Sequence, residues 1–319
     1  MDSRTIARIL GLEEVADQIE LVVGLSERYR AEVGAPIDEL SGLARSALEK
    51  LSRYQELSPA ELQALEQAVR MLRPILRVRN GGIPDLPDDA AARFPQWSSV
   101  RSGSRTVMAN VARIDGRAFG EEAAREVATA FAVTPELAIT NAHVVDDLSL
   151  GVRRLEPGRV ELLFGAEFDL DRVVEPSPVT EVVGIHADLD IAIVRFEAGE
   201  GAAPMGLPVS SDTPDELEAI AVPGFPQHDD RNPSYLSAAV PSLEPVYKRV
   251  APGIVRSSRS WGFVHDASTL GGNSGSPVLR MADLRVVGVH SGGGYRSGND
   301  AQGAHQAAAF LEANGIVLR

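Results

Sequence analysis

The sequence predicts a multidomain α+β protein in which a small N-terminal α-helical bundle precedes a larger all-β region. Apolar residues recur at three- and four-residue spacing up to about residue 80, and short strand-like runs follow from about residue 106. A stretch rich in Gly, Pro and Asp separates the two patterns. We therefore divide the chain into a bundle at residues 1–79, a linker at residues 80–99 and a β domain at residues 100–319.

The composition is that of an ordinary globular protein of 319 residues, with 44% hydrophobic and 24% charged residues. The chain has 31 basic and 45 acidic residues, a net charge of −14, so the basic face of a nucleic-acid-binding protein is not expected. It has no cysteine, which excludes disulfides, thiolate metal sites and a cysteine nucleophile. Since it shows no long apolar run and no signal-peptide pattern, we expect a cytoplasmic protein with no membrane partner.

Three helical segments are expected before residue 80. The first covers residues 6–25, and the second begins at Pro36. The third begins at residues 58–61 (Ser-Pro-Ala-Glu), a capping box with Pro at the first helical position, and its apolar pattern continues to Ile75. This bundle is interpreted as a recruitment or inhibitory module; the alternatives are a stability or oligomerisation appendage and a ligand-binding bundle.

The β domain is predicted from short β-type runs separated by turn residues, a pattern typical of an all-β sandwich or barrel. The runs are residues 107–114, 127–133, 137–140, 160–164, 182–185, 191–196, 217–222, 253–256 and 286–289. Two helical stretches are expected as well, at residues 89–93 and at residues 304–314, where Gly315 is a suitable C-cap.

Three motifs in the β domain contain the residue types of nucleophilic catalysis. Thr-Asn-Ala-His-Val-Val places His143 at the end of an apolar strand, and Asp-Ile-Ala-Ile-Val places Asp190 where burial of its carboxylate must be compensated. In Gly-Gly-Asn-Ser-Gly-Ser-Pro-Val the glycines permit a tight loop that projects the Ser274 hydroxyl and turns backbone N–H groups to one point. Taken alone, the first two motifs also fit a packed histidine and a turn aspartate.

Together the three motifs resemble those of the chymotrypsin-fold serine endopeptidases. The chain order His143, Asp190, Ser274, with spacings of 47 and 84 residues, is the order of that family. The resemblance covers about residues 100–319 and implies a chymotrypsin-like double barrel, all-β, that hydrolyses protein or peptide substrates. It implies no metal and no organic cofactor.

The resemblance also implies a role for each residue of the motifs. Ser274 attacks the scissile carbonyl, His143 takes its proton and passes it to the leaving amine, and Asp190 orients His143. Asp188 is the rival for the last role. The backbone N–H groups of Gly272 and Ser274 form the oxyanion hole.

Within that family the glutamyl endopeptidase branch is the most similar. Its pattern implies that Thr269 and His290 hold a substrate carboxylate, with a histidine cation as the donor. Ser291, Gly292 and Gly293 then form the pocket wall and pair with the substrate backbone. The alternative for His290 is a structural residue at a strand end. The other histidines are interpreted as surface residues: His186, His228, His265 and His305.

The chain departs from many secreted relatives at Asn273, where they carry an Asp that pairs with a newly freed N-terminal ammonium when the zymogen is activated. A neutral amide cannot form that ion pair, so we expect control through the N-terminal bundle and its protein partner or activator. The layout resembles bacterial defence proteins. The alternatives are an HtrA-like quality-control protease and a catalytically inactive protease-fold scaffold. The 45 residues after Ser274 are too few for the peptide-binding domain of an HtrA-like protein.

Overall fold

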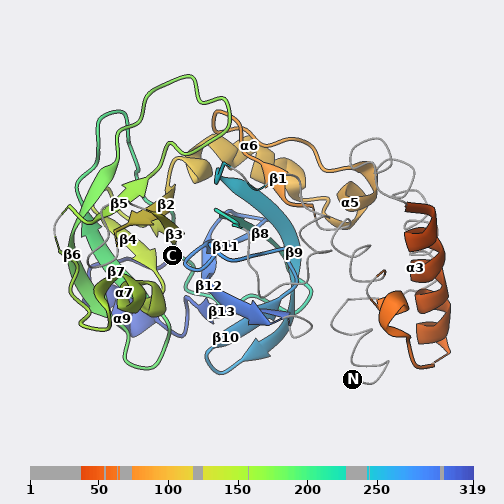
Figure 1. Ribbon diagram of the computed structural model, residues 1–319. Coiled ribbons are helices and arrows are strands. Elements are labelled where there is room, and N and C mark those ends of the chain that lie inside the picture. Colours follow the sequence, from red (N-terminus) through yellow and green to blue (C-terminus); the bar gives the residue numbers. More distant parts are fainter. Residues whose placement is uncertain are drawn as a thin grey trace.

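The computed structural model describes residues 37–53, 55–62, 64, 74–117, 125–156, 158–227, 243, 245–294 and 298–319. Over these residues two β-barrels lie next to each other, and the helices lie at their periphery (Figure 1). The predicted all-β double barrel is thus confirmed. The first predicted helical segment, residues 6–25, lies outside the described residues.

The first barrel is closed by six antiparallel strands in the order β2-β3-β4-β7-β6-β5. They are β2 (Val111–Gly116), β3 (Arg125–Ala132), β4 (Leu137–Thr140), β5 (Val160–Leu163), β6 (Ser177–Ile185) and β7 (Ala192–Phe196). Small alanines of β3 face Leu162 and Phe196 in its core, which lets the barrel close tightly. Helix α7 (Ala142–Ser149) follows β4 directly, because β4 ends at the barrel rim.

The second barrel is a circuit of six strands, β8-β9-β10-β13-β12-β11, closed because β8 pairs with both β9 and β11. Its strands are β8 (Ala219–Gly224), β9 (Arg249–Arg259), β10 (Gly262–His265), β11 (Pro277–Arg280), β12 (Val286–Gly294) and β13 (Gly298–Gly303). The two-residue strand β1 (Leu76–Arg77) adds to the edge of β9. Phe263, Val278 and Val287 are buried in the core of this barrel.

Residues 80–99 differ from the predicted linker. Helix α5 (Asp88–Arg93) forms where a helical stretch was expected at residues 89–93, but α6 (Trp97–Met108) also begins here, and the apolar side chains of the segment join the core shared by the two barrels. Trp97 is buried, and its indole N–H donates to the Pro84 carbonyl at 3.0 Å. Because burial of these side chains removes apolar surface from water, the segment is part of the β domain and not an exposed connection.

Further differences concern individual strands and helices. The strand expected from residue 107 begins only at Val111, because α6 continues to Met108. Strands β10, β11 and β13 were not predicted. The C-terminal helix is shorter than expected, α9 (Ala308–Ala313), and Gly315 follows it with φ +82°. Among the helices of the described segments, none combines the length and apolar composition that a bilayer crossing requires.

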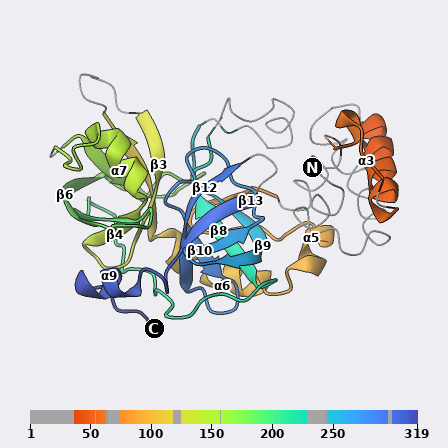
Figure 2. The same ribbon diagram turned by 90° about the horizontal axis from the view of Figure 1, so that it is seen from below.

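The N-terminal region is described in part. Helix α3 (Ile37–Ser52) forms where the second helix was expected, at the end of the molecule away from the first barrel (Figure 2). The capping box is present: the Ser58 N–H donates to Glu61 Oε2 at 2.8 Å, and the Glu61 N–H to the Ser58 hydroxyl at 3.3 Å. Lys50 and Ser46 of α3 also donate hydrogen bonds to Glu61. These bonds lower the pKa of Glu61 to about 2, and the bond from Lys50 has the largest effect.

Candidate active site

A histidine and a carboxylate meet where β4 and β7 lie side by side. Thr140 of β4 is opposite Ala192 of β7, which brings together the residues just beyond the two strands. His143 lies in the first turn of α7, and its Nδ1 is 2.7 Å from Asp190 Oδ2. The His143 backbone N–H donates to Asp190 Oδ1 at 2.9 Å. Both carboxylate oxygens are thus bound by one residue, which fixes the orientation of the imidazole.

The segment before β7 presents Asp190, and not Asp188, to the histidine. Asn141, which precedes α7, donates its side-chain N–H to the Asp190 carbonyl at 2.7 Å and holds the backbone there. Asp188 is exposed, and the contact that it makes is through its backbone N–H to His186 Nδ1 at 3.1 Å. The geometry therefore favours Asp190 over its rival.

The surroundings of His143 favour its protonated form. The hydrogen bond to Asp190 is the largest cause that raises the pKa of His143; burial opposes it, and the charges of Asp190, Asp147 and Asp146 raise the pKa further. Because Asp190 accepts at Nδ1, the neutral ring carries its proton there and leaves Nε2 as the base. The raised pKa makes Nε2 a stronger proton acceptor than an isolated histidine.

Ser274 lies on a loop that is bonded to the strands leading to His143. The Ser274 carbonyl accepts the Thr129 N–H at 2.9 Å, and the Thr129 carbonyl accepts the Thr140 hydroxyl at 2.9 Å. Gly275 has φ +85°, and a Cβ there would lie 2.1 Å from the Thr129 carbonyl oxygen, so only glycine fits. The Ser274 hydroxyl makes no hydrogen bond to the residues that the structure describes, and such bonds are often long before substrate binds.

The backbone N–H groups of Gly272 and Ser274 are available to a ligand, since neither has an acceptor within the described segments. The Gly272 carbonyl is used elsewhere, because it accepts the Thr129 hydroxyl at 2.8 Å. Gly272 has φ +83°, and a Cβ there would lie 2.3 Å from the Phe225 carbonyl oxygen. This tight backbone turn is what an oxyanion hole requires.

Asn273 completes the same loop without an ionic partner. Its side chain is buried, donates to the Leu270 carbonyl at 3.3 Å and accepts the Ser276 hydroxyl at 3.4 Å. The amide is therefore satisfied inside the loop. Because it carries no charge, the loop keeps this shape without a buried cation.

His290 on β12 lies next to the nucleophile loop and against a second histidine. Its N–H donates to the Ser276 carbonyl and its carbonyl accepts the Gly275 N–H, both at 2.9 Å. Its Nδ1 is 3.2 Å from Nε2 of His265 on β10. The prediction that His265 is a surface residue is wrong: β10 lies between β9 and β13, and the His265 ring is fully buried.

Both of these histidines are neutral. Burial lowers the pKa of His265 to about 3. Burial is also the largest cause that lowers the pKa of His290 well below its usual value, and the charges of His265 and His143 act in the same direction. The histidine cation expected at this position is therefore not formed in the free protein at neutral pH.

The remaining predicted pocket residues lie near His290 or in the nucleophile loop. Ser291, Gly292 and Gly293 continue β12 beyond the end of its pairing with β11, so within the described residues one edge of this stretch is unpaired. A Cβ on Gly292 would meet nothing within 4 Å, whereas on Gly293 it would lie 2.2 Å from a side-chain oxygen of β13. Thr269, five residues before Ser274, is buried.

His186, which was expected to be a surface residue, helps to position Asp190. Its Nδ1 accepts the N–H groups of Asp188 at 3.1 Å and Leu189 at 3.0 Å, and its own N–H donates to the Ile191 carbonyl at 2.9 Å. These bonds close the turn that presents Asp190. Its ring packs edge-on against Phe310 of α9, with the centroids 5.2 Å apart.

We expect His186→Ala to lower kcat about tenfold with little change in KM, because the turn loses its acceptor and Asp190 is no longer held in place. His186→Asn should retain most of the activity, since an Asn side-chain oxygen can accept the same two N–H groups. Steady-state kinetics of both variants test this. Equal losses in the two variants would show that the imidazole matters for packing and not as an acceptor.

The match to known protein families shows the class of this protein. Residues 128–289, just over half of the chain, match the trypsin-like peptidase domain, and His143, Asp190 and Ser274 lie within the match. The chain is an enzyme, a serine endopeptidase of the hydrolase class, with protein or peptide substrates. It belongs to the trypsin-like peptidase domain family.

The solved structures that are similar to this chain include the following three. The active form of the Rv3671c protease from M. tuberculosis is 20% identical, with 72% of this chain and 88% of that chain covered and a TM-score of 0.47. Its inactive form is 19% identical, with 72% and 97% covered and a TM-score of 0.46. The serine endoprotease from Yersinia pestis is 16% identical, with 69% and 66% covered and a TM-score of 0.47. No curated protein sequence matches this chain.

Proposed function

We propose that this enzyme cleaves peptide bonds after Glu, and less readily after Asp, with Ser274, His143 and Asp190 as its catalytic triad. The proposed preference for Glu is based on the histidine pair His290 and His265, which lies next to the nucleophile loop. The hydrogen bonds of His143 to both oxygens of Asp190 support the triad.

The chemistry follows from these positions. The Ser274 hydroxyl attacks the substrate carbonyl while His143 Nε2 takes its proton, and the imidazolium formed is stabilised by Asp190. The negative oxygen of the tetrahedral intermediate accepts the N–H groups of Gly272 and Ser274, an effect worth about 3–4 kcal/mol per donor. His143 then gives its proton to the leaving amine, and a water molecule repeats the sequence on the acyl-enzyme.

The histidine pair supplies a donor for the substrate carboxylate. If His265 Nε2–H donates to His290 Nδ1, the neutral His290 carries its own proton on Nε2. His290 Nε2–H then points away from His265 and can donate to a Glu side chain, together with the Thr269 hydroxyl. In this arrangement His290 can donate a hydrogen bond to the substrate carboxylate although its ring is neutral before the substrate binds.

Binding of a carboxylate changes the charge of the pair. A negative group next to His290 favours the protonated imidazole and counteracts the effect of burial on its pKa. The pair therefore takes up a proton with an acidic substrate and forms a charge-assisted hydrogen bond. An uncharged isostere such as Gln cannot drive this proton uptake.

We expect kcat/KM to be at least about tenfold higher for a peptide with Glu on the acyl side of the scissile bond than for the same peptide with Gln. His290→Leu should abolish this preference, because it removes the donor and keeps an apolar side chain. Turnover of matched peptides with Glu, Gln, Arg or Phe at this position tests both statements. Preferred cleavage after Arg or Phe in the wild-type enzyme would refute the proposed specificity.

A matched control separates specificity from catalysis. His290→Leu should react with a small fluorophosphonate at a rate close to that of the wild type, since the probe does not need the pocket. Loss of this reaction would mean that the substitution damages the nucleophile loop, and Thr269→Val then tests the pocket in its place.

We also propose that the N-terminal segment either inhibits the peptidase or recruits it to a partner protein. We place the enzyme in the cytoplasm and in a bacterial defence pathway. The capping box of Ser58 and Glu61, bonded to α3, supports an ordered module there. The support for a defence pathway is that bacterial defence proteins have a similar layout, with a helical segment before a trypsin-like domain.

The truncation that tests this role should leave the β domain complete. Removal of residues 1–90 would take away β1 and buried residues such as Val78 and Leu86, so residues 74–319 are the suitable fragment. If the segment inhibits, kcat/KM on a Glu peptide should be higher for residues 74–319 than for the full chain. Equal values would discard inhibition and leave recruitment.

A further inference from the structure

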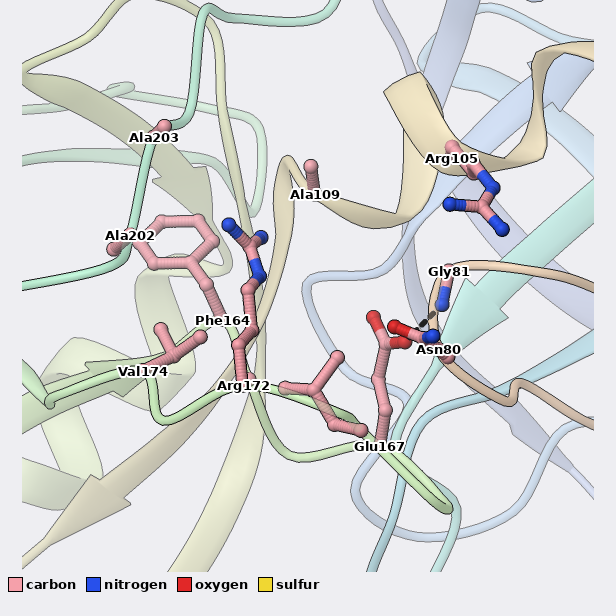
Figure 3. Close-up of a pocket in the computed structure, with 12 residues that line it drawn as sticks. Asn80, Gly81, Arg105, Ala109, Phe164, Glu167, Arg172, Val174, Ala202 and Ala203 are labelled. Carbon is pink, nitrogen blue, oxygen red and sulfur yellow. Dashed lines mark hydrogen bonds between the residues drawn. The ribbon is translucent and has the colours of Figure 1, made fainter.

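A cavity of about 300 Å³ lies apart from the catalytic residues, next to the end of α6. Its walls come from α6, from residues 80–81 and from the segments that follow β5 and β7, so it joins parts of the chain that are distant in sequence (Figure 3). Phe164, Leu170 and Val174 make its walls partly apolar. None of the residues assigned to the triad, oxyanion hole or specificity pocket lines it.

The one carboxylate that lines the cavity is already bound. Glu167 Oε1 accepts Lys248 Nζ at 2.7 Å, and Glu167 Oε2 accepts the Gly81 N–H at 2.6 Å (Figure 3). The Lys248 ammonium also donates to the carbonyls of Met108 and Phe164, at 2.6 and 2.9 Å. Lys248 and Glu167 are both buried, so their charges cancel within the wall.

Two arginines that line the cavity form no ion pair of this kind with a described residue. Figure 3 shows Arg105, from α6, and Arg172, from the segment after β5, on opposite sides of the space. Neither guanidinium has a carboxylate partner in the part of the chain that the structure describes. Both arginines are exposed, so their guanidinium groups are open to solvent and to a ligand.

The acidic residues nearest in sequence to Arg172 are used elsewhere. Asp169 forms an ion pair with Arg79, and Asp171 accepts a hydrogen bond from the Asn80 side chain. Burial is the largest cause that lowers the pKa of Lys248; the charge and hydrogen bond of Glu167 oppose it, and the charge of Arg172 has a smaller effect in the same direction as burial. The cavity therefore presents two guanidinium groups without an ion-pair partner among the described residues, while the Asp171 carboxylate lies at its edge, bonded to the neutral Asn80 side chain.

We propose that this cavity binds a small organic or inorganic dianion with carboxylate or phosphate groups, held between the guanidinium groups of Arg105 and Arg172. Guanidinium is suited to this because it donates two parallel N–H bonds to either group. The anion connects α6 to the segment after β5. Binding should therefore stabilise the folded enzyme.

The test uses the full chain with Ser274→Ala, so that the result does not depend on peptidase activity or on its specificity. Isothermal titration calorimetry with glutarate and with inorganic phosphate, at low salt, should show one site per chain for at least one of them. Thermal unfolding should shift upward at the same concentrations. The comparison of the two probes decides between a carboxylate and a phosphate ligand.

Charge-matched variants identify the site. Arg105→Gln with Arg172→Gln should weaken binding about tenfold or more, since two charge-assisted bonds are lost. Arg117→Gln with Arg154→Gln removes the same charge from exposed positions outside the cavity and should leave binding unchanged. Without anion, the first pair of substitutions should not lower the unfolding temperature, because neither guanidinium bonds to a described residue.

Three results would overturn the proposal. The first is that neither probe binds at concentrations up to about 10 mM, which is on the order of the weakest affinity expected of a specific site. The second is an equal loss of binding affinity in the two double variants, and the third is undiminished binding in Arg105→Gln with Arg172→Gln. If that variant is instead less stable without anion, the arginines hold the fold together and the cavity is not an anion site.

Discussion

Ser274→Ala should lower kcat for peptide hydrolysis by roughly 10⁴–10⁶-fold, because no other side chain can supply the attacking oxygen. The loop that carries Ser274 is held by backbone contacts, among them the bond from the Thr129 N–H to the Ser274 carbonyl at 2.9 Å. These contacts do not use the hydroxyl, so the variant should keep the geometry of the oxyanion hole. Turnover of a Glu-containing peptide measures the effect.

The control for this variant is its stability. Since the Ser274 hydroxyl has no hydrogen bond among the described residues, its removal should leave the unfolding temperature within a degree or so of the wild type, as expected for ΔΔG near zero. A folded Ser274→Ala enzyme that still turns over peptide at a rate near that of the wild type would contradict the assignment of the nucleophile.

Asp190→Asn should lower kcat by about 10⁴-fold while the fold is retained. The amide can donate where the carboxylate accepts, so it stabilises the His143 tautomer with the proton on Nε2, which cannot take the proton of Ser274. The substitution also removes the largest cause of the raised pKa of His143. The residual activity should therefore persist to lower pH than that of the wild type, since activity is lost as His143 becomes protonated.

Asp188→Asn is the matched control for this experiment. Asp188 is exposed, and its bond to His186 uses the backbone N–H, which the substitution keeps. We expect activity within about twofold of the wild type, as for a surface substitution. A larger loss in Asp188→Asn than in Asp190→Asn would reverse the assignment of the carboxylate.

The triad motifs could be recognised from the sequence because their chemistry restricts the residue types. The glycines around Ser274 are required by backbone contacts: a Cβ on Gly272 or Gly275 would lie within 2.3 Å of a carbonyl oxygen. Asp190 precedes an apolar strand that pairs with β4, which itself leads to His143. Local sequence therefore reflects the tertiary constraint at all three positions.

Helix α6 begins inside the predicted linker and extends into the strand expected from residue 107, and it shows why both predictions differ from the structure. Its sequence is rich in Ser, Gly and Thr, which are weak helix formers, and it follows a segment with several Pro and Asp residues. Its buried residues nevertheless have helical spacing: Trp97, Val100, Ser104 and Val107. Packing of this face against both barrels outweighs local propensity, and that contribution is not visible in local composition.

The second barrel contains strands with little β propensity. Strand β13, Gly-Asn-Asp-Ala-Gln-Gly, has no β-branched or aromatic residue, yet it pairs with β10 and β12 on its two sides. Cross-strand pairing of this kind depends on the whole sheet. The position of His265 inside the barrel against His290 also depends on the whole sheet: in sequence it lies between the apolar Val264 and the polar Asp266, while its neighbours in space come from β9, β12 and β13.

The most direct test of Ser274 as the nucleophile is reaction of the full chain with a fluorophosphonate, followed by mass spectrometry of the labelled peptide. We expect one adduct, on Ser274, that forms much more slowly in His143→Ala, because His143 no longer takes the serine proton. A stable, folded protein that forms no adduct, or forms it on another residue, would rule out Ser274 as the nucleophile and favour a protease-fold scaffold.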